Sequence, residues 1–340
     1  MAGFQDIIGH NQIVSHLKNA IQMDKISHAY ILNGEDNSGK MMLAEAFAMA
    51  LQCEEHGADA CMECRSCRQA LEHNQPDIIY VTHEEKSKSK SEGKDKPTTI
   101  SVDDIRIQIN NDMVIKPYSS KYKIYIVDNA EKMNIQAQNA LLKTIEEPPA
   151  YGIILLLTTN ADAFLPTILS RCITLNLKTV NEDLIKSHLM QKYHVPDYQA
   201  DVCTAFAQGN VGRAIQLATS EEFNELKSDV LSVVKKLQEI EFYELNDTIK
   251  KMNGYKKNFD EYLDLLTFWY RDVLYVKATN DVNNLIFRDE VYDIKKQAAK
   301  ISYSGIENIL QALELTRVRL KANVNFNLAI KLMLLTMKEN

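Results

Sequence analysis

The sequence of 340 residues predicts a parallel α/β fold followed by a long helical region. Short runs of consecutive apolar residues alternate with stretches of helical periodicity, which is typical of a parallel sheet covered by helices on both faces. A glycine-bounded loop with a lysine follows the first of these runs, as in phosphate-binding loops. Beyond residue 220 only helical patterns remain. We therefore expect a five-stranded parallel sheet of the P-loop type with flanking helices, then a small helical lid and an all-α C-terminal domain.

The expected elements can be placed by residue number from the position of apolar residues and of helix-stopping prolines. Strands are expected at 29–32, 78–81, 124–128, 153–159 and 173–177, and helices at 13–21, 43–51 and 134–147, the last stopped by two prolines. The expected domains are a P-loop domain at 1–178, a lid at 179–220 and a helical oligomerisation domain at 221–340. The first domain carries a cysteine-bearing insertion at 53–67.

Composition places the chain among ordinary globular proteins. The hydrophobic share is 45%, the charged share is 25% and the formal net charge is −7. No long uncharged apolar stretch and no secretion signal is present, so we expect no membrane span and a cytoplasmic location. A protein that binds DNA alone is usually basic, because phosphate neutralisation supplies non-specific affinity. The charge therefore fits either no nucleic-acid contact or DNA contact only as part of an assembly.

Residues 84–99 form a polar segment rich in lysine, serine and glutamate. This composition is typical of a surface loop that has no core of its own. The segment is either a solvated linker or a phosphate contact through its lysines, which are Lys86, Lys88, Lys90, Lys94 and Lys96.

The loop from Gly34 to Lys40 is the first candidate site. Its letters, GEDNSGKM, follow the pattern G-x-x-x-x-G-K-[ST], in which backbone N–H groups and the lysine hold phosphate oxygens. The last position is Met41 instead of a hydroxyl residue, and a thioether is a poor ligand for Mg²⁺. Gly34, Gly39 and Lys40 are thus expected to keep the backbone site while magnesium binding is weakened.

A second candidate lies in the letters KIYIVDNAE, where a strand ends in Asp128. Phosphate-loop enzymes keep the carboxylate that binds Mg²⁺ at such a position; the alternative is that Asp128 only caps the strand. The next residue is Asn129, whose amide cannot accept a proton from the attacking water. Glu131 is two residues further on and is expected to point elsewhere. Met41 and Asn129 together predict that the chain has lost ATPase activity.

Four of the six cysteines are clustered as Cys53, Cys61, Cys64 and Cys67. Two successive C-x2-C steps allow three sulfurs to converge from one turn, and the first cysteine can complete a tetrahedron. Four thiolates favour a closed structural Zn²⁺ site; free cysteines and an iron–sulfur site are the alternatives. The isolated Cys172 and Cys203 are expected to be small core residues.

Arg171 lies in the letters SRC just before the last predicted strand. At such a place an arginine is either an ordinary surface residue or a guanidinium presented to a neighbouring subunit. Oligomeric ATPases use an arginine of the second kind to stabilise charge on the neighbour's γ-phosphate. The spacing alone leaves both readings open.

The order of these motifs resembles that of bacterial clamp-loader subunits, which belong to the AAA+ superfamily. The resemblance is carried by GEDNSGKM, the four-cysteine insertion, VDNAEKM, NALLKTIEEPP at 139–149, TTN at 158–160 and SRC at 170–172. The defective loop beside an intact SRC is similar to the delta-prime type of DNA polymerase III rather than to the ATP-hydrolysing tau/gamma type. Over the helical third of the chain, the resemblance rests only on the segment 323–334 and on the length of the region.

This resemblance implies a non-hydrolysing component of a DNA-directed DNA polymerase holoenzyme. The component would work in an open five-subunit ring with tau/gamma and delta subunits and would help to load the sliding clamp onto primed DNA. By position, Arg171 would be the finger that reaches a neighbour's ATP, Asn160 would be the sensor and Arg213 the lid arginine. The four clustered cysteines would bind zinc, and the C-terminal helices would form the collar.

Two other readings of the sequence remain. The chain could be an active AAA+ ATPase of the tau/gamma type that uses its own Lys40 and Asp128, although Met41 and Asn129 argue against ATP and Mg²⁺ turnover there. It could also be a zinc-stabilised DNA-binding module, although the net negative charge of the chain argues against this.

Overall fold

The computed structural model describes residues 3–81, 99–237 and 244–340, and the chain divides into two compact units. The first comprises Met1–Leu184 with Asn210–Arg213, and the second comprises Ile185–Gly209 with Ala214–Asn340. The polar surface loop predicted at 84–99 lies outside the described residues except for Thr99.

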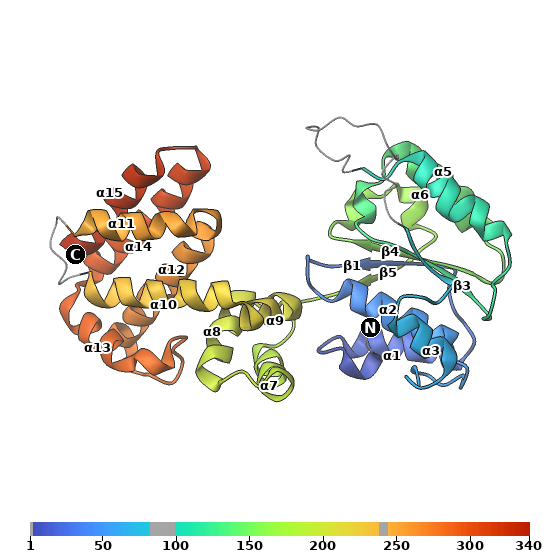
Figure 1. The fold of residues 1–340 in the computed structure, drawn as a ribbon, viewed down its shortest axis with the longest axis horizontal. Helices are drawn as coiled ribbons and strands as arrows, with labels where there is room; N and C mark the ends of the chain where they lie inside the picture. Colours follow the sequence, from blue (N-terminus) through green and yellow to red (C-terminus); the bar gives the residue numbers. More distant parts are fainter. Residues whose placement is uncertain (1–2, 82–98, 238–243) are drawn as a thin grey trace. The chain divides into compact units, whose positions relative to one another are not determined.

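The first unit contains a five-stranded parallel sheet, as predicted (Figure 1). The strand order is β2-β3-β4-β1-β5, and every neighbouring pair is parallel. Each strand lies within a residue of its predicted position, because buried parallel strands are runs of consecutive apolar residues. The bounds are Ala29–Asn33 (β1), Ile78–Val81 (β2), Lys123–Val127 (β3), Gly152–Thr158 (β4) and Ile173–Asn176 (β5).

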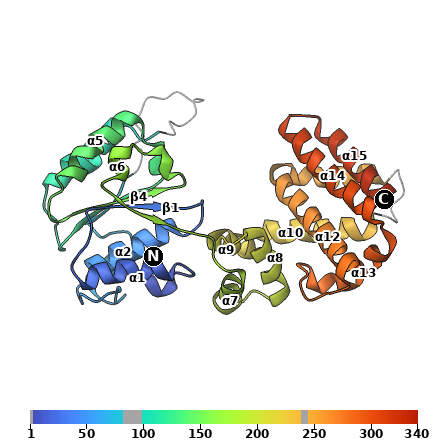
Figure 2. The same cartoon turned by 180° about the vertical axis from the view of Figure 1, so that it is seen from behind.

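Helices cover both faces of this sheet, with α1, α2 and α3 on one side and α5 and α6 on the other (Figures 1 and 2). Helix α5 ends at Glu146 before the two prolines, as predicted. The helical segments of the unit are η1 (Phe4–Asp6), α1 (Asn11–Gln22), α2 (Lys40–Gln52), α3 (Arg65–Leu71), α4 (Val102–Ile105), η2 (Arg106–Asn111), η3 (Asp112–Val114), η4 (Ala130–Lys132), α5 (Ile135–Glu146), η5 (Ala161–Ala163) and α6 (Pro166–Leu169).

Two apolar cores lie on the two faces of the sheet because successive side chains of a strand point to opposite sides. On β3, Tyr125 belongs to the core beneath α5, and Ile126 belongs to the core beneath α2. The central strands β1, β3 and β4 are almost entirely buried. The expectation that all strands are covered on both faces is wrong for β5, which is partly exposed because it is an edge strand.

The second unit is helical, and α7 (Glu182–Tyr193) enters it from the first. Its longest helix, α12, buries Trp269 completely, and the indole N–H donates to Gln297 Oε1 at 2.9 Å. No helix in the described part of the chain has the length and apolar character to cross a membrane. The remaining segments are α8 (Asp197–Ala207), α9 (Val211–Thr219), α10 (Glu221–Lys236), α11 (Leu245–Met252), η6 (Asn253–Asn258), α12 (Phe259–Thr279), η7 (Arg288–Glu290), α13 (Val291–Lys300), α14 (Tyr303–Lys321) and α15 (Phe326–Glu339).

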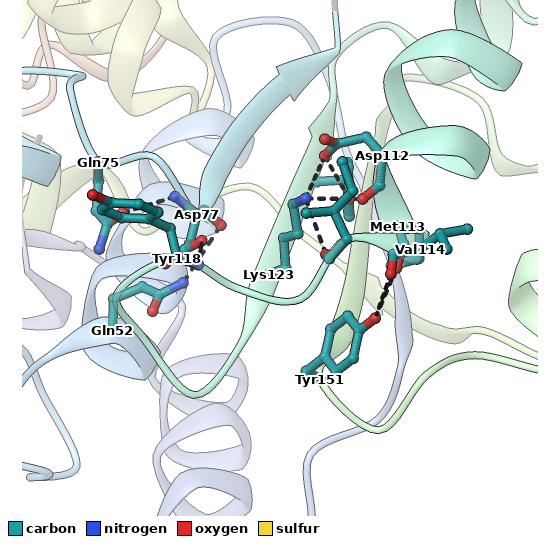
Figure 3. A network of polar contacts seen from close by, with 11 residues as sticks. Gln52, Gln75, Asp77, Asp112, Met113, Val114, Tyr118, Lys123 and Tyr151 are labelled. Carbon is teal, nitrogen blue, oxygen red and sulfur yellow. Dashed lines mark hydrogen bonds and ion pairs between the residues drawn. The ribbon is translucent and has the colours of Figure 1, made fainter.

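A buried polar network fixes the approach of the chain to β3 (Figure 3). The carboxylate of Asp77, 1% exposed, accepts the N–H groups of Tyr118 at 2.6 Å and Ser119 at 2.8 Å. At the start of β3, the buried ammonium of Lys123 lies 2.8 Å from a carboxylate oxygen of Asp112 and donates to the carbonyl of the same residue. The network thus holds both ends of the turn that leads into β3.

Replacing Asp77 by asparagine should destabilise the first unit. The amide has one acceptor oxygen instead of two, so one of the two backbone N–H groups loses its partner and a buried NH₂ group takes the place of an acceptor, at a cost of about 1–3 kcal/mol. Urea unfolding followed by far-ultraviolet circular dichroism measures the change. The matched control is Asp162→Asn, which removes the same charge at an exposed position of the same unit; equal midpoints for the two variants would contradict the role of Asp77.

Candidate functional site

The glycine loop connects β1 to α2, as the phosphate-binding pattern requires. Helix α2 begins at Lys40, and Gly39 before it has a φ of +94°, a conformation that glycine adopts without strain. The ammonium of Lys40 donates to the carbonyl oxygens of Gly34 at 2.6 Å and Glu35 at 2.7 Å. The lysine is only 8% exposed, so these two bonds satisfy a cation that is largely withdrawn from water.

The loop retains features that suit a phosphate group. Burial lowers the pKa of Lys40, while the charges of Asp36 and Glu131 oppose that shift. The hydroxyl of Ser38 and Nε2 of His10 are buried and have no hydrogen-bond partner among the described residues. A loop with unused polar atoms, a left-handed glycine and a lysine fits the phosphate end of a nucleotide.

Residues 210–212, within the segment predicted as a lid, are hydrogen-bonded to this loop. Asn210 donates through its amide to the carbonyl of Asp36 at 2.7 Å, and the N–H of Gly212 donates to the carbonyl of Asn37 at 3.1 Å. A Cβ on Gly212 would lie 2.3 Å from that carbonyl oxygen, so no larger residue fits there. Arg213, the expected lid arginine, follows this contact on α9 and is exposed.

The structure places the expected metal ligand, Asp128, and the substituted position, Met41, as follows. Asp128 lies just beyond β3, and its two carboxylate oxygens accept the backbone N–H of Asn129 at 2.9 Å and its side-chain amide at 3.0 Å. Asn129 has a φ of +50°, in the left-handed region that asparagine tolerates. Met41 packs against the core between the sheet and α2. The thioether of Met41 is a poor ligand for a hard cation, whereas the exposed Asp128 carboxylate is held by two local bonds and keeps further lone pairs.

The position of Glu131 differs from the expectation that it points elsewhere. Its negative charge acts on Lys40, and one carboxylate oxygen accepts the hydroxyl of Thr159 at 3.3 Å. Asn160 follows β4 as expected for the sensor position, and its side-chain oxygen accepts the N–H of Asp162 at 3.0 Å. An acid therefore lies near the lysine, contributed by a residue that the motif pattern did not single out.

Arg171 is exposed on the turn between α6 and β5. Its guanidinium lies 3.0 Å from a carboxylate oxygen of Glu146 and donates to the carbonyl of Thr167 and the hydroxyl of Ser170. About two-fifths of the side chain is exposed, so this surface ion pair contributes little stability. The arginine is thus available at the surface.

Sheet topology places Arg171 far from the chain's own phosphate loop. Strands β1 and β5 are parallel, with Tyr30 beside Ile173 and Asn33 beside Asn176. The loop follows β1, whereas Arg171 precedes β5. Because the two strands are parallel neighbours, the loop and Arg171 lie at opposite ends of the strands. Six residues of strand rise separate them, which is roughly 20 Å at ~3.3 Å per residue.

The four clustered cysteines converge, as the spacing predicts. Their sulfur atoms all lie within 4.8 Å of one another, and those of Cys61 and Cys67 are 3.9 Å apart. Sulfurs at ~2.3 Å from a tetrahedral metal ion are about 3.8 Å apart, so the cluster is compatible with a metal ion. Cys53 caps the end of α2, and Cys64 caps the start of α3, which positions the sulfurs through two helix ends.

Backbone N–H groups are directed at these sulfurs. The N–H of Cys64 donates to the sulfur of Cys61 at 3.3 Å, and the N–H of Cys67 donates to that of Cys64 at 3.3 Å. Backbone N–H donors lower the pKa of Cys61 to about 7, whereas burial raises the pKa of Cys67. A donor set that stabilises thiolate fits a site for a soft or borderline metal ion.

Sequence reasoning missed two parts of these sites. The first is the ion pair between Glu146, in the segment NALLKTIEEPP, and Arg171. The second is the contact of Asn210 and Gly212 with the loop, which joins residues 174 positions apart. Neither pairing leaves a local signal in the sequence.

Comparison with known proteins identifies the family. The model of a family described as DNA polymerase III, delta subunit, matches residues 9–181, just over half of the chain. The chain belongs to this family. A second model, DNA polymerase III, delta subunit, C terminal, matches residues 223–339, so both units carry a family signature.

Three proteins with similarity to the chain are described by their names and coverage. DNA polymerase III subunit delta' of Bacillus subtilis is 29% identical over 332 residues, which is 96% of each chain, and confirms the expected delta-prime resemblance. The tau subunit of the same organism is 26% identical over 312 residues, covering 85% of this chain and 53% of tau. A solved DNA polymerase III gamma-subunit-related protein of Thermotoga maritima is 22% identical, with a TM-score of 0.41 and coverage of 96% and 98%.

Alkylation of the metal-free protein should reveal the unequal cysteines. With a pKa of about 7, Cys61 is mostly thiol below pH 7 and mostly thiolate above it, so its reaction with iodoacetamide should accelerate through pH 7 and then level off. Cys67, with its raised pKa, should react slowest of the four. Peptide mass spectrometry after short exposures measures both rates; faster modification of Cys67 would refute the thiolate order.

Proposed function

We propose that the chain is a non-hydrolysing subunit of the bacterial replicative clamp loader, within the DNA polymerase III holoenzyme. It would assemble with tau/gamma and delta subunits in the cytoplasm, help to load the sliding clamp onto primed DNA, and supply Arg171 to a neighbour's ATP. Membership of the delta family and similarity to subunit delta' support the assembly. The proposed architecture is a P-loop domain at 1–178, a lid at 179–220 and a collar at 221–340.

One observation carries the absence of hydrolysis. Both carboxylate oxygens of Asp128 accept bonds from Asn129, the residue that stands where a hydrolytic enzyme has its water-polarising glutamate. The asparagine thus removes the base and also engages the metal-binding carboxylate. Met41, turned into the core, removes the remaining magnesium ligand. Gly34, Gly39 and Lys40 are then a vestigial nucleotide loop, with Asn160 and Arg213 in the sensor and lid positions.

Arg171 suits a role in a neighbouring active site. It lies at the opposite end of the strands from its own loop, so it can serve only the nucleotide of another subunit. Its restraint is a surface ion pair to Glu146, which a phosphate can replace because charge-assisted bonds to phosphate are bidentate and stronger.

Exposed apolar side chains on the C-terminal unit support a collar role. Leu315 and Val318 on α14 are 51% and 55% exposed, and Leu328 on α15 is 53% exposed. Leu315 and Val318 are three residues apart and therefore lie on the same face of α14, where they leave a small apolar strip exposed. The C-terminal helices therefore have unburied surface for adjoining subunits.

The second candidate is an active ATPase of the tau/gamma type. It is favoured by Glu131, whose charge acts on Lys40 and which could polarise water in place of the missing glutamate. Such an enzyme would hydrolyse ATP as an isolated chain. The clustered cysteines fit either candidate, and we propose that they bind a structural Zn²⁺ ion.

Arg171→Ala should lower ATP hydrolysis by the reconstituted complex, while the isolated chain shows no turnover before or after the change. An arginine finger contributes about 10³–10⁵ in rate at one site, and a ring with several sites should show a smaller total loss. The measurement is steady-state phosphate release with clamp and primed DNA present.

Two comparisons complete this experiment. Lys178→Ala, which removes an exposed cation from the same unit, should leave the rate unchanged. Arg171→Lys should remain defective, because an ammonium cannot reproduce the guanidinium fork. Turnover by the isolated chain that Lys40→Ala abolishes would select the ATPase and reject the proposed role.

Metal analysis should return about one zinc per chain, the number that one tetrahedral four-thiolate site holds. Cys64→Ser should reduce that content and lower the thermal midpoint, because structural zinc contributes directly to folding. Cys203→Ala, which alters a cysteine buried in the second unit, should keep the full zinc content. Metal-free protein with an unchanged midpoint would exclude a structural metal.

A further inference from the structure

The C-terminal unit contains a pocket that none of the sites above accounts for. It lies among η6, the start of α12 and the turn between α14 and α15, and its volume is about 520 Å³. Pockets that hold small ligands or ligand segments have about 300–1,000 Å³. Its residues fall within 253–260 and 320–327, inside one unit, so the pocket does not depend on how the two units are arranged.

The charge of the lining is positive although the chain as a whole is acidic. Lys256, Lys257 and Lys321 line the pocket together with a single acid, Asp260. The carboxylate of Asp260 lies 3.4 Å from a guanidinium nitrogen of Arg317, which is closer to Asp264, at 2.6 Å. The net charge of the whole chain is −7, so a lining with three lysines and one acid is locally opposite in sign to the chain.

The floor and one wall of the pocket add donors to these cations. Helix α15 begins here, and Asn325, Phe326 and Asn327 of its first turn line the pocket. Backbone N–H groups at a helix start, together with its dipole, favour an anion. The ring of Phe326 packs edge-to-face on Phe259 at 4.8 Å, and the ammonium of Lys256 lies 5.8 Å from its centroid. The lysine stem is thus supported at the mouth of the pocket.

We infer that this pocket binds phosphate groups of a single nucleic-acid strand. Its cations are ammonium groups, which bind phosphate as compact point charges, and the lining lacks the guanidinium fork that matches a planar carboxylate. Lysines around one concavity supply the positive charge with which proteins follow the backbone of a single strand. The choice of a strand as the phosphate source rests on the proposed function, whereas the charge of the pocket does not.

The experiment uses the full chain and a fluorescently labelled oligodeoxythymidylate, with anisotropy measured over a range of salt concentrations. The triple change Lys256→Gln, Lys257→Gln and Lys321→Gln should weaken binding at low salt by about ten-fold or more, because three phosphate contacts are lost. The slope of log affinity against log salt should fall by about 2, at ~0.7 per phosphate for single strands.

The matched control removes the same charge elsewhere in the unit. Lys295→Gln, Lys300→Gln and Lys331→Gln are exposed positions on α13 and α15 outside the pocket. This variant should keep most of the affinity and of the salt slope. Both variants should keep the circular dichroism spectrum of the parent. An equal loss in the two variants, or no strand binding by the parent at the lowest salt, would overturn the inference.

Competitors distinguish the sources of the anion. Displacement of the strand by thymidine monophosphate at equal phosphate concentration would make a free nucleotide the ligand and reject the strand. Displacement by polyglutamate at equal charge would reject phosphate chemistry altogether. Because the assay contains neither partner subunits nor ATP, its failure leaves the proposed function untouched, and loss of the Arg171 effect in the complex leaves the pocket untouched.

Discussion

Two hydrogen bonds from the Lys40 ammonium to carbonyls of its own loop are the constraint on which the site of the first unit depends. A cation withdrawn from water must be satisfied, and here two carbonyl oxygens of the loop accept its bonds. The two following carbonyls, of Asp36 and Asn37, are also capped by protein donors. The loop is therefore a closed, self-bonded turn at the carboxyl end of β1. Any nucleotide that enters must compete with those bonds for the lysine.

The expected magnesium side of the site is also shaped by local bonds. Asp128 receives its two bonds from the residue next to it, so the orientation of the carboxylate is set by local backbone geometry. Each oxygen accepts one bond and keeps a further lone pair, so these bonds orient the carboxylate. Position 41 carries a thioether in place of the hydroxyl that would bind the same ion, and a thioether is a poor ligand for a hard cation.

Much of this could be predicted from the sequence, because the informative patterns are local. Consecutive apolar residues fixed the strands to within a residue, and C-x2-C spacing brought four sulfurs together. The partial exposure of β5 was not predictable, since its own apolar residues do not reveal that it is an edge strand. Contacts between distant residues were also invisible. Glu146 meets Arg171 only in the folded sheet, and Lys256 and Lys321 belong to different helical segments.

Residues 210–212 give the glycine loop a structural contact that does not depend on hydrolysis. The carbonyls of Asp36 and Asn37 accept bonds from the side chain of Asn210 and the N–H of Gly212, at the start of α9. Gly212 approaches so closely that a Cβ would overlap the carbonyl of Asn37. The contact therefore requires the course that the loop follows at Asp36 and Asn37. The shape of the loop is constrained by this packing as well as by any ligand that it binds.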